Sequence, residues 1–140
     1  MEKSCGIVLF NSDKILILHY SIDEEGNGGH WDFPKGHVEK NEEEIETALR
    51  ELEEETNIKD IKLSDDFKSS IKYNVLKDSK LIAKEVIFFI GKTKIWDVKL
   101  SSEHQHYSWL NYEDALNRLT YDNAKKLLQE AYIFMKKENV

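Results

Sequence analysis

Apolar runs along the chain predict a set of short strands. Residues 4–10 (SCGIVLF) and 14–20 (KILILHY) are rich in aliphatic side chains and flank a polar turn, which is typical of a β-hairpin. Residues 67–76 carry apolar side chains at alternate positions, and residues 81–90 (LIAKEVIFFI) have the composition of a central buried strand. Further short strands are predicted at 59–63, 94–100 and 107–110, with breaks at 77–80, Gly91 and 101–106.

Helical periodicity predicts two main helices and a shorter one. Asn41 can cap the first main helix, with Glu44 at its third position as in a capping box. Asn111 can cap a short helix over residues 112–119, and Thr120 can cap the last helix. The last helix has an apolar stripe made of Ala124, Leu127, Leu128, Ala131 and Phe134 or Met135. Strands interleaved with these helices predict an α/β sandwich around a mixed sheet.

Composition narrows the class of protein. The chain has 140 residues, which fits one domain over residues 1–140. A net charge of −7 argues against a sequence-independent nucleic-acid binder, which needs a basic surface. Cys5 is the only cysteine, and a buried apolar role is favoured for it over a catalytic thiol. The sequence has neither a signal-peptide pattern nor an apolar run of membrane-spanning length, so we expect a cytoplasmic protein.

An acidic run in the first main helix is the strongest candidate for chemistry. Glu51, Glu54 and Glu55 are spaced i, i+3, i+4 and share one helix face. Negative charge is unfavourable near a helix C-terminus, although Arg50 can pair with Glu54. A divalent cation would remove the repulsion, and carboxylate oxygens suit magnesium or manganese. A solvated charged helix face is the alternative interpretation.

The wider pattern around this run resembles the Nudix box, G-x5-E-x7-R-E-U-x-E-E-x-G-U, in which U is bulky and apolar. Residues 36–58 match every fixed position except Asn57, where the family usually has glycine. We predict that Asn57 ends the helix in the left-handed conformation, which Asn tolerates. The resemblance implies a Nudix-type α/β/α sandwich with a mixed β-sheet between helices.

The flanking segments are similar to a narrower group. The pieces HWDFPKGHVE, TALRELEEET, FKSSIKY, AKEVIFF and LSSEHQHYSWL resemble asymmetrical diadenosine tetraphosphate hydrolases of the animal and archaeal type. This likeness runs from about residue 4 to about residue 128. It implies cleavage of diadenosine tetraphosphate by metal-activated water into ATP and AMP, with Mg²⁺ as the cofactor and Mn²⁺ as a possible replacement.

The resemblance also implies roles for single residues. Glu51, Glu54 and Glu55 would bind the metal, and Glu103 would be a further ligand or the general base. Whether Glu51 or Glu103 is the base stays open.

On the substrate side, Lys35 would contact the phosphates, and His30 and Lys84 would line the polyphosphate path. Tyr73 and Tyr121 would sandwich an adenine, with ordinary packing as the alternative for both tyrosines.

Two other functions compete with this one. The first is a Nudix hydrolase that acts on RNA 5′ ends or other nucleoside polyphosphates, and the second is a nucleotide sensor that has lost catalysis. For the favoured function we expect a small dinucleoside polyphosphate as partner, no long nucleic acid, no membrane, and a monomer.

Overall fold

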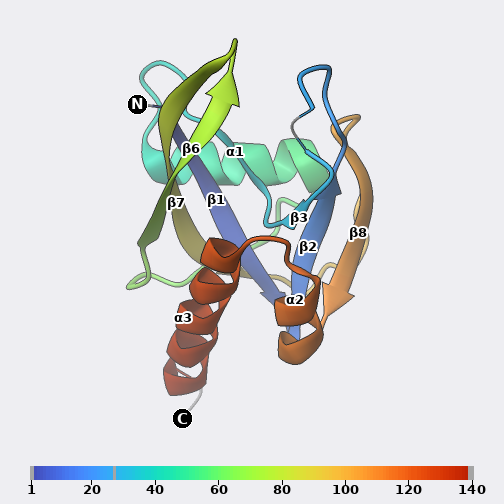
Figure 1. Cartoon of the computed structure of the whole chain (residues 1–140). Coiled ribbons are helices and arrows are strands. Elements are labelled where there is room, and N and C mark those ends of the chain that lie inside the picture. Colours follow the sequence, from blue (N-terminus) through green and yellow to red (C-terminus); the bar gives the residue numbers. More distant parts are fainter. Residues whose placement is uncertain (1, 27, 139–140) are drawn as a thin grey trace.

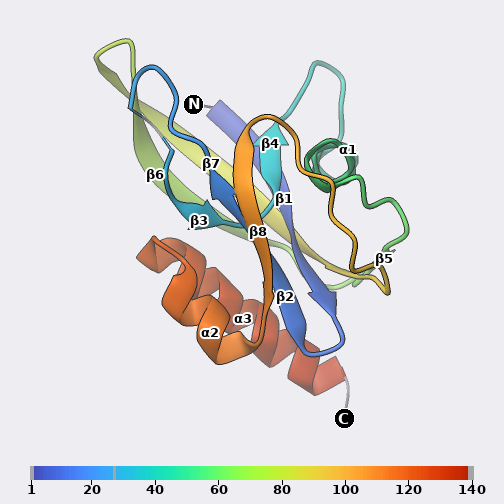
Figure 2. The ribbon, with the colours of Figure 1, turned by 90° about the vertical axis from the view of Figure 1, so that its right-hand side faces the viewer.

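A mixed β-sheet separates one helix from two others (Figures 1 and 2). The computed structural model describes residues 2–26 and 28–138. Among them the elements are β1 (Glu2–Asn11), β2 (Lys14–Tyr20), β3 (Trp31–Asp32), β4 (Lys35–His37), α1 (Glu44–Thr56), β5 (Lys62–Leu63), β6 (Ser69–Lys77), β7 (Lys80–Lys92), β8 (His104–Leu110), α2 (Tyr112–Arg118) and α3 (Asp122–Glu138). The predicted α/β/α sandwich with a mixed sheet is confirmed.

Strand β1 lies at the centre of the sheet. It pairs antiparallel with β2, as the predicted hairpin requires, and parallel with β7 from Glu2 opposite Lys84 to Phe10 opposite Lys92. The sheet order is β3-β2-β1-β7-β5, while β4 pairs with β1, β6 with β7 and β8 with β2. This topology brings β4 to the sheet beside α1 (Figure 2).

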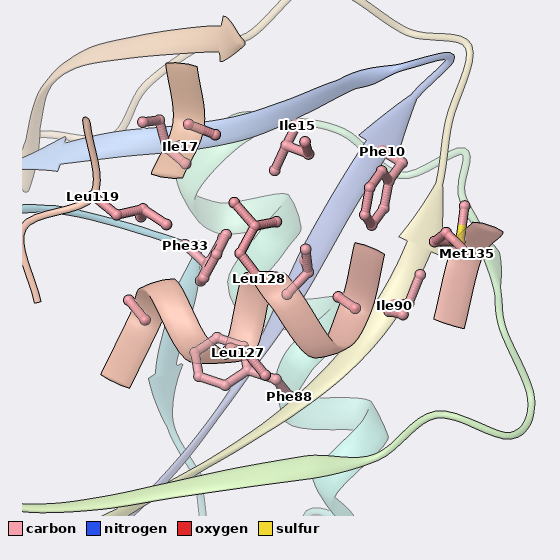
Figure 3. Close-up of a cluster of buried hydrophobic side chains, with 14 of the residues drawn as sticks. Phe10, Ile15, Ile17, Phe33, Phe88, Ile90, Leu119, Leu127, Leu128 and Met135 are labelled. Carbon is pink, nitrogen blue, oxygen red and sulfur yellow. The ribbon is translucent and has the colours of Figure 1, made fainter. Parts of the chain in front are cut away.

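Each face of the sheet buries its own apolar core. Even-numbered residues of β2 such as Leu16 and Leu18 pack with Ala48 and Leu52 of α1. The other face packs against α2 and α3, as Figure 3 shows. Its fully buried side chains include Ile15, Ile17, Phe33, Phe88, Ile90, Leu119, Leu127 and Leu128. Full burial of such a side chain contributes about 1.5–3 kcal/mol, so both helical layers are held firmly. Of the helices described, none is both long and apolar enough to span a membrane.

Both ends of α1 are capped, but the start differs from the prediction. Glu43, not Asn41, is the N-cap, and it forms a capping box with Glu46. Asn41 instead takes a left-handed backbone conformation (φ 67°) in the preceding turn. At the other end Asn57 has φ 62° and ψ 17°, and its N–H donates to the carbonyl of Glu53. The prediction of a left-handed cap at Asn57 is therefore confirmed.

Two predictions for the chain at the end of β7 are wrong: the break at Gly91 and the strand at 94–100. Gly91 does not end the strand, because it pairs with Leu63 of β5 and β7 continues to Lys92. Residues 94–100 form no strand. Their backbone is satisfied by contacts from elsewhere in the chain, such as the Lys99 N–H bond to the Thr56 carbonyl at 3.0 Å.

The starts of β8 and α3 also differ from the predicted ones. The stretch 101–106 is only partly a turn, because β8 begins at His104 and pairs with β2. Thr120 does not cap α3, which begins at Asp122. The hydroxyl oxygen of Thr120 accepts a hydrogen bond from the Trp31 N–H at 2.8 Å, so Thr120 links β3 to the α2–α3 connection. The cap predicted at Asn111 is confirmed by its bond from the Asp114 N–H.

Candidate active site

The segment between β3 and β4 is fixed by hydrogen bonds from β1 and β2. The N–H of Ile7 in β1 donates to the carbonyl of Pro34 at 3.1 Å. The hydroxyl of Tyr20 in β2 donates to the carbonyl of Phe33 at 2.8 Å. Because these bonds fix the backbone, the residues that follow, Lys35 and Gly36, are held directly against α1.

Lys35 and Gly36 contact the acidic face of α1. The backbone N–H of Lys35 donates to Oε1 of Glu55 at 2.9 Å. The carboxyl group of Glu51 lies where a β-carbon at Gly36 would be. Two of the four candidate metal ligands are thus positioned by the backbone of β4.

Arg50 forms hydrogen bonds with three carboxylates of this region. Its guanidinium donates to Glu42 at 2.6 Å, to Glu51 at 3.0 Å and to Glu54 at 3.1 Å, which confirms the predicted pair with Glu54. It also donates to the carbonyl of His37 at 2.9 Å and so ties α1 to the end of β4. The hydrogen bond from Arg50 lowers the pKa of Glu42 to about 2.

Burial and mutual repulsion raise the pKa values of the inner carboxyl groups. Burial, and then the charge of Glu55, raise the pKa of Glu51 to about 7, against the opposing effect of Arg50. Burial raises the pKa of Glu55 to about 9, although the N–H of Lys35 acts against it and the charge of Glu103 adds to it. Burial is thus the main cause of the raised pKa values of Glu51 and Glu55, and repulsion from neighbouring carboxylates adds to it.

Glu103 lies in the loop before β8. Its carbonyl accepts the N–H of Ser21 at 2.9 Å, which fixes the loop against the end of β2. Glu103 is exposed, and its charge acts on Glu55. The next residue, His104, is buried and places Nε2 at 3.1 Å from Oε2 of Glu55. Glu51, Glu54 and Glu55 thus lie in the C-terminal half of α1, and Glu103 lies in a loop from which its charge acts on Glu55.

The cluster fits a divalent cation by its chemistry. In the described part of the chain, no three His, Cys, Asp or Glu side chains are already grouped as a metal site. The donors nevertheless are carboxylate oxygens, which hard cations prefer, and repulsion between neighbouring carboxylates adds to the raised pKa values of Glu51 and Glu55. A cation would remove that repulsion.

The ammonium group of Lys35 lies away from the acidic face of α1, and two side chains of the protein bind it. Nζ is 3.0 Å from Oδ2 of Asp32 and 3.0 Å from the hydroxyl of Tyr73. The side chain of Lys35 is 10% exposed and that of Asp32 4%. Burial acts to lower the pKa of Lys35, but the charge of Asp32 and the contact with Tyr73 more than offset this effect, so the pKa is raised.

Lys84 completes the basic side of the site. It lies directly opposite Tyr73 in the β6–β7 pair. Burial, followed by the positive charge of Lys35, lowers the pKa of Lys84. The structure therefore brings Lys35, Tyr73 and Lys84 together, while a polyphosphate path along His30 and Lys84 stays a prediction.

His30 and Tyr121 form a separate aromatic group with Tyr20. The ring of His30 stacks on Tyr20 at 4.9 Å with an interplanar angle of 5°, and lies 5.3 Å from the ring of Tyr121. Burial lowers the pKa of His30, which favours its neutral form. Tyr121 is 49% exposed and available to a ligand. The adenine sandwich between Tyr73 and Tyr121 stays a prediction.

Three residues of the site were not singled out from the sequence. Tyr20 is half-buried and His104 is buried at the acidic cluster, and Asp32 is buried beside Lys35. For Asp32 a signal existed, because an acidic residue three positions before a lysine in an otherwise apolar segment calls for a charge partner.

Comparison with known proteins agrees with this geometry. The family model described as NUDIX domain matches residues 2–131. The chain is 33% identical to the rat bis(5′-nucleosyl)-tetraphosphatase [asymmetrical], over 95% of both chains. It is 29% identical to an RNA pyrophosphohydrolase of Pelagibacter ubique, over 81% of this chain and 78% of that one.

A solved structure matches over nearly the same length. The crystal structure of a C. elegans Ap4A hydrolase in a binary complex superposes with a TM-score of 0.86 at 30% identity, and the match covers 98% of this chain and 99% of the other. Sequence, fold and the acidic face of α1 lead to the same assignment. The chain belongs to the NUDIX domain family.

Proposed function

We propose that this chain hydrolyses diadenosine tetraphosphate asymmetrically, to ATP and AMP. The observation that carries the proposal is the position of Lys35 between two parts of the site. Its N–H holds Glu55 of the acidic cluster, while its ammonium group lies beside the hydroxyl of Tyr73. A polyphosphate at Lys35 would have carboxylates for a metal on one side and an aromatic ring on the other. The rat relative and the C. elegans structure, both named for this activity, support the same substrate.

The cofactor in this proposal is Mg²⁺, which Mn²⁺ can replace. Nudix hydrolases use divalent metal ions, and the residues that would hold one are Glu51, Glu54, Glu55 and Glu103. These carboxylates alone would repel an anionic substrate from a protein of net charge −7. Bound there, the cation would neutralise phosphate oxygens and lower the pKa of water.

The side chains of the chain itself bind and orient the substrate. Lys35, Lys84 and His30 would contact the polyphosphate, and the rings of Tyr73 and Tyr121 would stack on adenine. Stacking of a base on an aromatic ring contributes about 1–3 kcal/mol. The proton of the attacking water would pass to a carboxylate of the cluster, either Glu51 or Glu103.

Product analysis tests the proposal directly. The purified chain is mixed with diadenosine tetraphosphate and Mg²⁺, and the nucleotides are separated and quantified. ATP and AMP in equal amounts are expected, and a chelator should abolish their formation. Two ADP per substrate would contradict the asymmetrical cut. Tight binding of the dinucleotide without hydrolysis, at any concentration of Mg²⁺ or Mn²⁺, would instead indicate a silent nucleotide sensor.

A second candidate activity is removal of phosphates from RNA 5′ ends. The observation that favours it is the likeness to the relative from Pelagibacter ubique named RNA pyrophosphohydrolase. The net charge of −7 acts against it, because binding of RNA depends on phosphate contacts with basic side chains. Equal turnover of a 5′-triphosphorylated RNA and the dinucleotide, in the same buffer and salt, would favour this activity.

The chain is also proposed to act as a cytoplasmic monomer. Every candidate site residue comes from one chain, so the site needs no second copy. The buried free thiol of Cys5 suits a reducing compartment. Sedimentation analysis of the purified chain tests the oligomeric state, and fractionation of cells tests the location.

A further inference from the structure

We propose that Asp32 is a positioning residue, whose carboxylate holds the ammonium group of Lys35 beside Tyr73 so that Lys35 can receive a phosphate of the substrate. The inference rests on the proposed function, because it takes a dinucleoside polyphosphate as the ligand of Lys35.

The carboxylate of Asp32 is itself fixed in place. Asp32 belongs to β3 and lies opposite Leu18 of β2, in the body of the sheet. Its Oδ1 accepts the N–H of Phe33 at 2.7 Å. This bond directs the other oxygen, Oδ2, to Nζ of Lys35 at 3.0 Å. Asp32 is 3% exposed, so solvent contributes little to its orientation.

Lys35 needs such a partner because its side chain is long and flexible. An ammonium group has three N–H donors on a four-carbon stem. One donor goes to Asp32 and one to the hydroxyl of Tyr73. The third is left for a phosphate oxygen, and its direction is set by the two bonds already made.

The charge of Asp32 has two opposing effects on substrate binding. A carboxylate near the phosphates repels them, and it cancels the long-range attraction of Lys35. Without Asp32, however, the ammonium group of Lys35, whose side chain is only 10% exposed, would be a buried charge with only the hydroxyl of Tyr73 as partner. Lys35 therefore acts through one directed hydrogen bond, and the loss of direction outweighs the loss of repulsion when Asp32 is changed.

The test uses steady-state kinetics of the full chain with diadenosine tetraphosphate and Mg²⁺. Asp32→Asn should raise KM by about 10- to 100-fold, which is the range for loss of one hydrogen bond to a charged group. The value of kcat should change much less. Asp13→Asn makes the same chemical change at the exposed β1–β2 turn and should leave both constants unchanged. Unchanged KM and kcat in Asp32→Asn would overturn the proposal.

A double-variant cycle separates positioning from general damage to the fold. If Asp32 acts through Lys35, adding Asp32→Asn to Lys35→Met should cost no further kcat/KM. Losses that add would overturn the proposal. Should Asp32→Asn fail to fold, Asp32→Glu keeps the charge and displaces the carboxylate. A raised KM in Asp32→Glu would then support positioning, and a wild-type KM would overturn it.

Binding of inorganic tripolyphosphate with Mg²⁺, measured by calorimetry, keeps this inference distinct from the proposed function. A wild-type chain that does not cleave the dinucleotide contradicts the function only. If that chain binds tripolyphosphate and Asp32→Asn binds it about 10- to 100-fold more weakly, the positioning role is supported. Equal affinity of the two chains, or no binding by the wild type, overturns it.

Discussion

The carboxyl group of Glu51 occupies the space that a β-carbon would fill at Gly36. A methyl group there would collide with Cδ and both oxygens of Glu51, on the opposite side of the interface between β4 and α1. The carboxyl group is the far end of a flexible side chain, so it can move aside at little cost to the fold. The glycine of the box is thus needed for the position of a candidate metal ligand.

Gly36→Ala should therefore lower turnover by about a hundredfold, since a displacement of about 1 Å at a catalytic group can have that effect. The midpoint of thermal unfolding should change little. The measurements are kcat with diadenosine tetraphosphate and the midpoint of thermal unfolding, each for the wild type and the variant. The matched control is the same change in a Glu51→Ala background, where the methyl group has room and should cause no additional loss. A further loss there would mean that Gly36 acts by another route.

Glu54→Gln should abolish most turnover while the fold survives. The side chain of Glu54 is 56% exposed, and its bond with Arg50 is a surface ion pair, which is worth about 0.3–0.5 kcal/mol. Loss of a metal ligand should cost at least about a hundredfold in kcat, because a bound metal supplies several kcal/mol of charge stabilisation. Glu53→Gln is the control, since Glu53 lies on the same helix, 51% exposed, and is not a candidate ligand. Near-normal turnover in Glu54→Gln would remove Glu54 from the ligand set.

Divalent metal should stabilise the folded chain. A cation that binds only the folded state adds about 2.7 kcal/mol at a hundredfold excess over its dissociation constant. Mg²⁺ or Mn²⁺ should therefore raise the midpoint of thermal unfolding, and a chelator should reverse the effect without unfolding the chain. A Glu51→Gln/Glu55→Gln variant should show no rise with metal. The same rise in this variant would place the metal elsewhere.

The core and the acidic helix could be predicted because their signals are local. Apolar runs around a polar turn defined β1 and β2, helical periodicity defined the stripe of α3, and a left-handed Asn57 followed from the place of the glycine in the Nudix box. The strand predicted at 94–100 failed because its apolar residues, such as Val98 and Leu100, pack beside α1 without pairing to a neighbour. Composition does not distinguish these two ways of burying an apolar side chain.

The site could be predicted only as far as its residue types, because their partners are distant in sequence. The contact between Lys35 and Tyr73 joins residues 38 positions apart, and the contact between Glu55 and His104 depends on the register of β8. The buried pair of Asp32 and Lys35 is close in sequence, but its burial comes from the sheet around it. Pairing across strands thus decides which predicted residues meet.

The ion pair between Arg50 and Glu42 should make a pH-dependent contribution to stability. The hydrogen bond from Arg50 lowers the pKa of Glu42 from 4.5 to about 2 in the folded state. A lowered carboxyl pKa stabilises the fold above the unfolded value, and the contribution is lost as the pH falls from about 4.5 to about 2. Glu42→Gln should therefore be less stable than wild type at pH 7, and this difference should shrink at pH 3. Chemical unfolding at both pH values measures it.

A suitable control for this experiment is Glu39→Gln. Glu39 also faces Arg50, but at 3.6 Å and with a side chain that is 67% exposed. Its replacement should change stability little at either pH. If the difference in unfolding free energy between wild type and Glu42→Gln stays constant with pH, the hydrogen bonds of Glu42 stabilise the fold by their geometry and not by its charge.

Asn57, the one departure from the box, should affect stability without affecting catalysis. Its φ of 62° is strained for a residue with a β-carbon, and its N–H closes the last turn of α1 on Glu53. Asn57→Ala should lose about 1–2 kcal/mol of unfolding free energy, while Asn57→Gly should stay within about 0.5 kcal/mol of wild type. Because neither change touches a carboxylate, kcat should be equal in Asn57→Gly and wild type. A large gain of activity in Asn57→Gly would instead mean that asparagine here suppresses catalysis, as a nucleotide sensor requires.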